Sequence, residues 1–427
     1  MKRKLIITAF ILNIVLVGCA DSSNLLKSAN PENMSEHGIN ASTDNMIVGE
    51  PITVVLDRSA EDLKKYSLVD EGYDTPIKSQ RNGTCWVYAP STSMESTYKK
   101  KYGEDISIDY IDLLEAVYSE NPTEGYFLKV QEAKGDIGGW VWQVVEKTAN
   151  GFDKYILEDA SSYVNTDIKT MKSAIVQYGA MNVAINDANQ SKFGYFDNYY
   201  TLNDPDSEDF DHAVVLVGWD DDFPKEYFRQ EAKQNGAWLA QNSRGDKWGN
   251  GGYYWVSYDT PFIENTIFQV TDVYKKVVSY DGGGENHICT GDITKIANIF
   301  HEKGLLKAIG TYTVLPSQKI TIDVCDDKLS KVLFRKEVTF EIPGYHTVEL
   351  DTPIEVEDYA VAISYDGDAP VEGESWENSL IGYAVTINPG ESFVCVDGKW
   401  IDMANKRIRS KLGIDFTPNN CCIKAIY

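Results

Sequence analysis

Three residues that lie far apart along the chain carry the groups that a single nucleophilic site requires. Cys85 is the only cysteine between residues 20 and 288, His212 opens an apolar run, and Asn242 follows it. A thiol attacks a carbonyl only as a thiolate, so it needs a base, and the base needs a third group that fixes its tautomer and direction. If these residues act together, the chain must fold so that three distant segments meet.

Each of the three residues also has a purely structural interpretation. A buried cysteine is usually an inert small hydrophobic residue, and a histidine that opens an apolar strand is more often a hydrogen-bonded core residue. Asn242 alone would be an ordinary turn or cap residue. The other four histidines lie in a polar N-terminal tract or beyond residue 280, so His212 is the only candidate base for Cys85.

Three more residues are candidates for binding the reacting group and the substrate. The second half of the stretch from Cys85 to Tyr102 has a helix-compatible composition, which would place the sulfur near a helix N-terminus, where partial positive charge lowers a thiol pKa. The side-chain amide of Gln80 and the backbone N–H of Cys85 are candidate donors to a developing oxyanion. Gly138 and Gly139 leave the backbone bare, so an extended peptide could pair with it.

These segments resemble, in order, those of the papain-like cysteine peptidases over roughly residues 59 to 260. The matching segments are Thr75 to Trp86, the pair Gly138-Gly139, Asp211 to Trp219, and Asn242 to Tyr254 with the aromatic Trp248. The resemblance implies an α+β fold in which a helical lobe and a β-rich lobe place Cys85 opposite His212. It also implies polypeptide substrates, substrate contacts from Gly138, Gly139 and Trp248, and no cofactor.

Three positions depart from the pattern of this family. Gln80 lies five residues before Cys85 instead of six, which predicts a tighter oxyanion loop. Arg244 replaces a tryptophan that covers the histidine–asparagine hydrogen bond, which predicts a wetter and weaker bond. Pro90 follows the nucleophile closely, which predicts a kink near Trp86 or a helix that starts late.

Apolar periodicity predicts the main elements of both lobes. Helices are expected over Ile106 to Tyr118 and Trp140 to Ala149. Strands are expected over Met181 to Ile185, His212 to Trp219, Ala237 to Leu239 and Gly252 to Tyr258.

The N-terminal residues resemble a bacterial lipoprotein signal. A basic start precedes an apolar run that is short for a bilayer span and ends at Cys19. The resemblance implies removal of residues 1–18, lipidation of Cys19, and anchoring at the extracellular face of the cytoplasmic membrane; an uncleaved or ordinary secretory signal is the alternative. Residues 19–58 then form a polar flexible stalk or a short prosegment.

The remaining chain divides into two predicted domains, 59–275 and 276–427, with a hinge expected at Asp281 to Gly284. Short alternating runs such as Ile320 to Val324 and Tyr359 to Ile363 are typical of an antiparallel β-sandwich. The second domain resembles the lectin-like domains that follow such peptidases in anaerobic Gram-positive bacteria. Glycans or cell-wall material are therefore candidate partners.

The charge of the chain excludes some partners. A net charge of −25 and a pI near 4.6 argue against nucleic-acid binding. Acidic residues at 204–211 and 220–222 predict an acidic rim at His212 that prefers cationic peptides, although a solvated loop is the simpler interpretation. The spacing at 204–208 resembles a calcium loop but lacks the required glycine, so no metal is predicted.

The last third of the chain holds five cysteines, an odd number that cannot all pair within the chain. Cys421 and Cys422 are adjacent and bond each other poorly on geometric grounds. We therefore expect reduced or only partly bridged thiols.

The leading hypothesis is a surface-anchored cysteine endopeptidase that forms an acyl-enzyme at Cys85. A catalytically silent adhesin that binds glycans or cell wall is the first alternative. A peptidoglycan amidase that uses the same Cys–His pair is the second.

Overall fold

The structure is a computed structural model of the 427-residue chain. It describes residues 54, 56, 60, 62–118, 124–129, 138–164, 166–187, 190–285, 287–289, 293–373, 375–377, 380–405 and 420–427. The predicted signal sequence 1–18, Cys19 and most of the predicted stalk lie outside the described residues.

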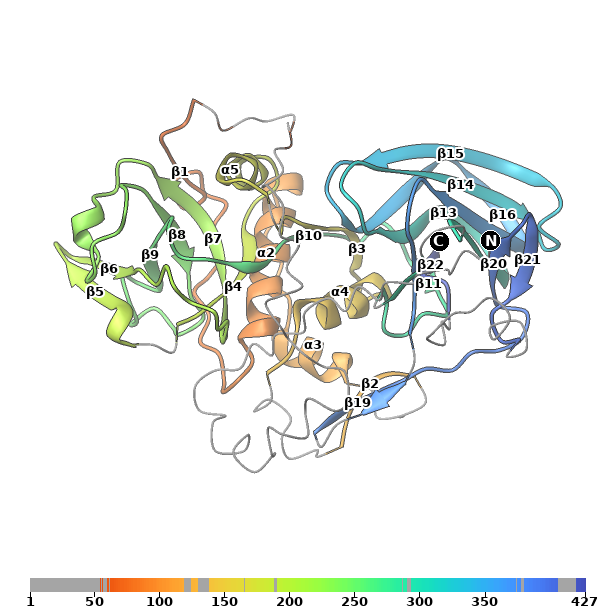
Figure 1. Cartoon of the computed structure of the whole chain (residues 1–427), viewed down its shortest axis with the longest axis horizontal. Coiled ribbons are helices and arrows are strands. Elements are labelled where there is room, and N and C mark those ends of the chain that lie inside the picture. The colour runs from red at the N-terminus through yellow and green to blue at the C-terminus, as the bar shows by residue number, and fades with distance from the viewer. Residues whose placement is uncertain are drawn as a thin grey trace, which may run out of the picture.

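Three parts lie in a row along the molecule (Figure 1). A β-rich lobe occupies one end, helices occupy the middle, and a second β-rich unit made of the C-terminal residues occupies the other end. The predicted fold class, a two-lobed α+β domain followed by a β-rich unit, is confirmed.

The helical lobe contains α2 (Cys85–Tyr102), α3 (Tyr110–Val117) and α4 (Val141–Ala149). Helix α2 begins at Cys85 and contains Pro90, so the expected late start is wrong. It ends at Gly103, whose positive φ of 74° suits a helix C-cap. Helix α3 begins later than the predicted Ile106 because the carboxylate of Asp109 accepts hydrogen bonds from the backbone N–H groups of Ile111 and Asp112.

The β-rich lobe is built around the long central strand β7. Its strands are β1 (Lys65–Ser67), β4 (Met181–Ile185), β5 (Phe193–Phe196), β6 (Tyr199–Leu202), β7 (His212–Asp220), β8 (Ala237–Gln241) and β9 (Tyr253–Ser257). Strand β7 pairs antiparallel with β1, β4 and β8, and helix α5 (Ile168–Gln177) packs against it. The four strands predicted from the sequence are all present here.

The second unit is an antiparallel β structure. Its elements are β11 (Val277–Val278), β12 (His287–Cys289), β13 (Lys295–Thr313), β14 (Gln318–Asp326), β15 (Val332–Phe340), β16 (Gly344–Tyr365), β17 (Ala369–Val371), β18 (Trp376–Glu377), β19 (Ile381–Ala384), β20 (Ser392–Val396), β21 (Lys399–Asp402) and β22 (Ile423–Ile426). Strands β13 and β16 pair along most of their lengths, and the two predicted runs lie within β14 and β16.

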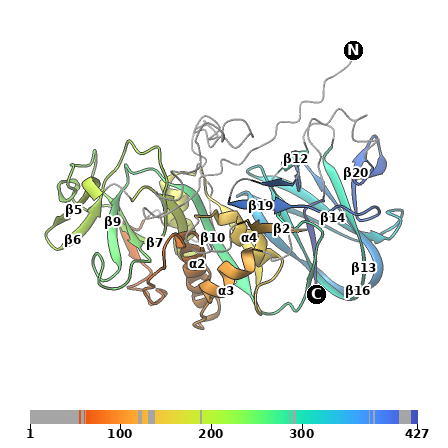
Figure 2. The same ribbon diagram turned by 90° about the horizontal axis from the view of Figure 1, so that it is seen from below.

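Strand pairing joins the two units directly. Strand β10 (Ile263–Thr271) pairs with β3 (Ile156–Ser162), and β3 pairs in turn with the start of β16. Strand β2 (Gly125–Leu128) of the first domain pairs with β19 of the second, and both strands are labelled in the view from below in Figure 2. Hydrogen-bonded strands therefore run from one unit into the other.

The segment Asp281 to Gly284, where a hinge is predicted, is closely packed in the structure. A Cβ at Gly283 would lie 2.0 Å from the ring of Tyr383, and one at Gly284 would lie 2.1 Å from the carboxylate of Glu146. These glycines therefore allow close packing at the domain junction and do not provide a flexible linker.

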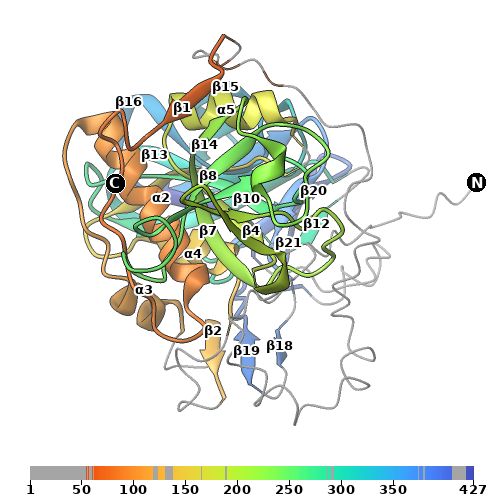
Figure 3. The same ribbon diagram turned by 90° about the vertical axis from the view of Figure 1, so that its left-hand side faces the viewer.

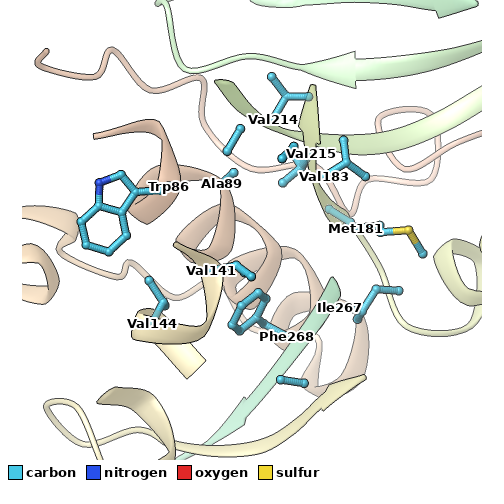
Figure 4. Close-up of a cluster of buried hydrophobic side chains, with 14 of the residues drawn as sticks. Trp86, Ala89, Val141, Val144, Met181, Val183, Val214, Val215, Ile267 and Phe268 are labelled. Atoms are coloured by element: carbon cyan, nitrogen blue, oxygen red, sulfur yellow. The ribbon is translucent and has the colours of Figure 1, made fainter. Parts of the chain in front are cut away.

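Helix α2 is the centre of the first hydrophobic core. Figure 3 views it from the β-rich lobe, with β7 and β4 beside it, and both strands contact α2. Figure 4 shows part of this core, with Trp86 and Ala89 of α2 beside side chains of other elements: Val141, Val144, Met181, Val183, Val214, Val215, Ile267 and Phe268. The packing fixes α2, and with it Cys85, relative to β7. Among the described residues, no helix has the length and apolarity needed to cross a bilayer.

Candidate active site

The candidate nucleophile is the first residue of α2, a largely buried helix. Cys85 is 0% exposed and begins α2, with Thr84 in the N-cap position. The unsatisfied N–H groups of a helix N-terminus favour negative charge on a group placed there. The predicted position of the sulfur at a helix N-terminus is therefore present.

The candidate base and its partner come from neighbouring strands. His212 is the first residue of β7, Asn242 directly follows β8, and the two strands pair antiparallel. The His212 ring nitrogen Nε2 lies 2.9 Å from the side-chain oxygen Oδ1 of Asn242. His212 is 1% exposed and Asn242 is 2% exposed. The sequence predicted that Arg244 would leave this hydrogen bond more exposed to water and weaker. The structure differs, because both side chains are buried and lie at ordinary hydrogen-bond distance.

Backbone geometry determines which histidine tautomer is present. The N–H of Ser243 donates to Oδ1 of Asn242 at 2.7 Å, and a backbone N–H can bond only an acceptor. The same amide oxygen can therefore only accept from His212, so Nε2 carries a proton. In the neutral ring Nδ1 is then the basic nitrogen, as a proton acceptor for a thiol requires.

A buried acid that the sequence interpretation missed lies on the other side of this bond. Asp187 follows β4, its side chain is 2% exposed, and its Oδ2 lies 3.6 Å from Nε2 of His212. Its Oδ1 accepts a hydrogen bond from Nη2 of Arg244 at 2.5 Å. No local sequence pattern marks this acid, because the pairing of β4 with β7 brings it to His212.

Gln80 is held against the segment that carries Asn242. Its backbone N–H donates to the carbonyl of Ser243 at 2.7 Å, and its side-chain oxygen accepts from the Ser243 hydroxyl at 2.6 Å. Its amide nitrogen donates to the carbonyl of Asn82 at 2.6 Å, within the loop that precedes α2. The shortened spacing thus places one amide hydrogen in a local turn.

The glycine pair lies beside the nucleophile segment. Gly138 and Gly139 are buried just before α4, and a Cβ at Gly139 would lie 2.4 Å from the indole of Trp86. Glycine is therefore required at 139 for packing, whatever its role in substrate binding. Trp248, the other predicted substrate contact, lies with its ring centroid 5.7 Å from the guanidinium carbon of Arg244.

A small cavity shows that the elements of the site are packed together. Its volume is about 10 Å³. It is lined by residues of α2, β7 and β8 and by their flanking residues: Lys78, Tyr88, Ala89, Thr92, Ala213, Val214, Val215, Gln241, Asn242 and Ser243. Burial lowers the pKa of Lys78, although Glu95, 2.7 Å away, acts in the opposite direction.

Part of the predicted acidic rim lies away from His212. Asp220 stands at the opposite end of β7, about 26 Å away for eight residues of strand. Asp204, Asp220, Asp221 and Asp222 are paired with Lys192, Lys65, Lys172 and Lys64, respectively. These lysines pair with four of the eight acidic residues at 204–211 and 220–222, and the sequence pattern does not locate them.

The remaining thiols differ from Cys85 in their surroundings. None of the six described cysteines forms a disulfide. Burial raises the pKa of Cys289 to about 12 and that of Cys325 to about 11, and it also raises the pKa values of Cys421 and Cys422. Within the described ranges, no group of three or more His, Cys, Asp or Glu residues could hold a metal ion.

The fold and this site define the class of two-lobed, papain-like domains in which a helix N-terminal cysteine accompanies a buried histidine–asparagine pair. Residues 64–271 match the papain family cysteine protease model, and residues 279–427 match the lectin like domain model. The chain therefore carries a papain family cysteine protease domain followed by a lectin-like domain.

Two curated relatives resemble the first domain. A cathepsin L-like peptidase of Aedes aegypti is 25% identical over 219 residues, covering 48% of this chain and 62% of that protein. Cathepsin K of Mus musculus is 29% identical over 213 residues, covering 43% of this chain and 56% of that protein. The chain thus spans about three-fifths of the length of these relatives.

Two solved structures share the whole arrangement. The protease and lectin-like domains of Cwp84, a surface layer associated protein of Clostridium difficile, superpose with a TM-score of 0.69 at 17% identity, covering 96% of both chains. The clostridial cysteine protease Cwp84 after propeptide cleavage gives a TM-score of 0.69 at 19% identity, covering 85% of this chain and 98% of that one. At these identities the likeness shows a shared fold.

Proposed function

We propose that the protein is a cysteine endopeptidase that hydrolyses peptide bonds through Cys85, His212 and Asn242. The observation that carries the proposal is the buried 2.9 Å hydrogen bond between His212 and Asn242, with Nε2 as its donor. It leaves the basic nitrogen of the ring for the thiol proton. The protease domain family supports the same reaction class.

In the proposed first step, the Cys85 thiolate attacks the carbonyl carbon of the scissile amide. Negative charge then develops on the carbonyl oxygen, and the Cys85 backbone N–H with the second amide hydrogen of Gln80 would stabilise it. The imidazolium of His212 donates its proton to the leaving nitrogen as the C–N bond breaks. The products of this step are a free amine and a thioester on Cys85.

In the proposed second step, water hydrolyses the thioester. His212 accepts a proton from the attacking water, the C–S bond breaks, and the acid is released with the thiolate restored. Asn242 holds the ring through both steps. Gly138, Gly139 and Trp248 would position the substrate chain.

The location and domain boundaries are also proposals. We infer division into residues 59–275 and 276–427, with a lipid anchor at Cys19 on the extracellular face of the membrane. The likeness to a surface layer associated protein supports a surface location. The lectin-like domain supports glycans or cell-wall material as partners.

Turnover of a mixed peptide library tests the proposed activity. Wild type should produce internal cleavages, and Cys85→Ala should abolish them while leaving the folded signal unchanged. A second variant, Cys395→Ser, removes a partly exposed thiol of the lectin-like domain and should cleave like wild type. Equal cleavage by Cys85→Ala and wild type would refute the proposal.

A silent, glycan-binding protein is the second candidate. Two observations favour it: the amide nitrogen of Gln80 donates to Asn82, and Cys85 is 0% exposed. The sulfur would have to become exposed before a substrate carbonyl could reach it, and one of the two amide hydrogens of Gln80 is already engaged. Firm binding to glycan or cell-wall arrays together with an unreactive Cys85 would favour this candidate over the peptidase.

A further inference from the structure

Asp187 is placed where its charge acts on the candidate base. Its carboxylate is almost completely buried, and Oδ2 lies 3.6 Å from Nε2 of His212. Among the described residues, no donor forms a hydrogen bond with Oδ2. A buried carboxylate oxygen without a hydrogen bond is costly, so its position beside an ionisable ring requires an explanation.

Two contacts hold Asp187 in place. The Asp187 backbone N–H donates to the carboxylate of Asp211 at 2.9 Å, and Asp211 immediately precedes His212. The N–H of Asp211 donates to the carbonyl of Ile185 at 3.1 Å. These hydrogen bonds connect the end of β4 to the start of β7, so Asp187 and His212 are fixed relative to each other.

Arg244 orients the carboxylate. Its Nη2 lies 2.5 Å from Oδ1 of Asp187, which leaves Oδ2 on the side of the imidazole. The guanidinium is 29% exposed and lies over the ring of Trp248. It therefore partly screens the charge of the carboxylate from the histidine.

We propose that Asp187 is a positioning residue that stabilises the protonated ring of His212, with Arg244 orienting its carboxylate. The inference rests on the proposed role of His212 as the base for Cys85. In the reactive form of the site, the thiol proton resides on the ring, so the imidazolium stands beside the thiolate. A carboxylate next to Nε2 stabilises that imidazolium from the side opposite the nitrogen assigned to the sulfur.

The histidine–asparagine bond is buried, and the Asp187–Arg244 pair lies beside the histidine. His212 and Asn242 are both buried, although residue 244 is not the tryptophan of the family pattern. The charged groups around the ring are Asp187, Asp211 and Arg244. Tyr254 also faces them from β9, and burial holds its pKa well above the usual range.

The rate of Cys85 alkylation by iodoacetamide, measured from pH 4 to 10 by intact mass, tests the inference without requiring substrate turnover. The wild-type profile should show a thiolate plateau and then an upper step where the imidazolium loses its proton. In Asp187→Asn the carboxylate charge is gone, so the upper step should move down by about one pH unit. In Arg244→Gln the carboxylate is unscreened, so the step should move up.

A matched control exists in the other domain. Asp323 is also buried and paired with an arginine, Arg335, whose Nε lies 2.6 Å from its Oδ1. Asp323→Asn removes the same chemical group far from His212 and should leave the upper step unchanged. A shift in this control as large as that in Asp187→Asn would overturn the inference.

The other outcomes separate this inference from the proposed function. A folded Asp187→Asn protein with a wild-type upper step overturns the inference and leaves the peptidase proposal intact. If Asp187→Asn does not fold, an upward shift in Arg244→Gln supports the inference, and an unchanged or lower step overturns it. A wild-type protein without a thiolate plateau overturns both proposals.

Discussion

Replacing Lys424 with methionine should weaken the junction between the two domains. Lys424 lies in β22 and is 0% exposed. Its Nζ lies 2.7 Å from Oδ2 of Asp281, 3.4 Å from Oε1 of Glu146 in α4, and 3.1 Å from Oδ1 of Asn150. Methionine keeps the length of the side chain and removes its charge, so the change isolates the ionic contacts.

The size of the effect follows from the burial of both partners. Removing one member of a buried ion pair costs about 3–5 kcal/mol, because the other charge is left unpaired. Burial raises the pKa of Asp281 to about 7 even though Lys424 opposes the shift. At pH 8 the acid is ionised in the wild type, so the variant loses a formed ion pair. At pH 5.5 it can take up a proton, so the loss in Lys424→Met should be smaller.

Urea denaturation at both pH values measures the free energy of unfolding. A matched control is Lys303→Met, because the side chains of Lys303 and its partner Glu357 are 78% and 69% exposed. Exposed pairs contribute little, so this variant should stay within about 0.5 kcal/mol of wild type. A loss in Lys424→Met of less than about 1 kcal/mol at pH 8 would refute the argument that the cluster ties the domains together.

Three other predictions concern the site and the pH response. Asn242→Ala removes a buried hydrogen bond to a charged ring, and such a bond contributes about 1.5–3 kcal/mol, so kcat/KM on a peptide should fall about 10- to 150-fold. An unchanged kcat/KM would contradict the role of Asn242. Gly139→Ala places a Cβ 2.4 Å from the Trp86 indole and should lower the free energy of unfolding, measured with heat or urea, by about 1–3 kcal/mol. An unchanged free energy of unfolding would show that the backbone around residue 139 can move away from the indole. Asp281 has a folded-state pKa of about 7, above its ordinary value, so its contribution is present below about pH 4 and lost as the pH rises to 7. Stability should therefore fall less steeply over this range in Asp281→Asn, and equal slopes would contradict the prediction.

The strands of the protease domain and the site residues on them could be predicted because their patterns are local. An apolar run after His212 indicates a buried strand whatever surrounds it, and β7 begins at that residue. The order of Cys85, His212 and Asn242 then identified the family. The structure brings His212 and Asn242 into contact through the pairing of β7 with β8.

Asp187 could not be predicted as part of the site because its neighbours depend on tertiary pairing. Ile185 lies opposite His212 in the register of β4 and β7, and this register carries Asp187 to the imidazole. Arg244 was interpreted as a weak replacement for an aromatic cover. Its role as the partner of a buried acid becomes visible only when both segments are folded.

The glycines at 282–284 show a different limit of sequence interpretation. Glycine serves both flexible linkers and close packing, and composition alone does not distinguish the two uses. Here the packing is set by Tyr383 and Glu146, which come from distant parts of the chain. The start of helix α3 is also set by the side chain of Asp109, which caps the helix N-terminus. Apolar periodicity does not indicate such a cap.

The most direct test of the central claim is the alkylation rate of Cys85 at pH 6, compared between the wild type and His212→Ala in a Cys395→Ser background. If His212 holds the thiol proton, Cys85 should react first among the thiols, and His212→Ala should slow its reaction by about tenfold or more. Reaction of Cys85 no faster than that of the C-terminal thiols, or an equal rate in both proteins, would contradict the claim.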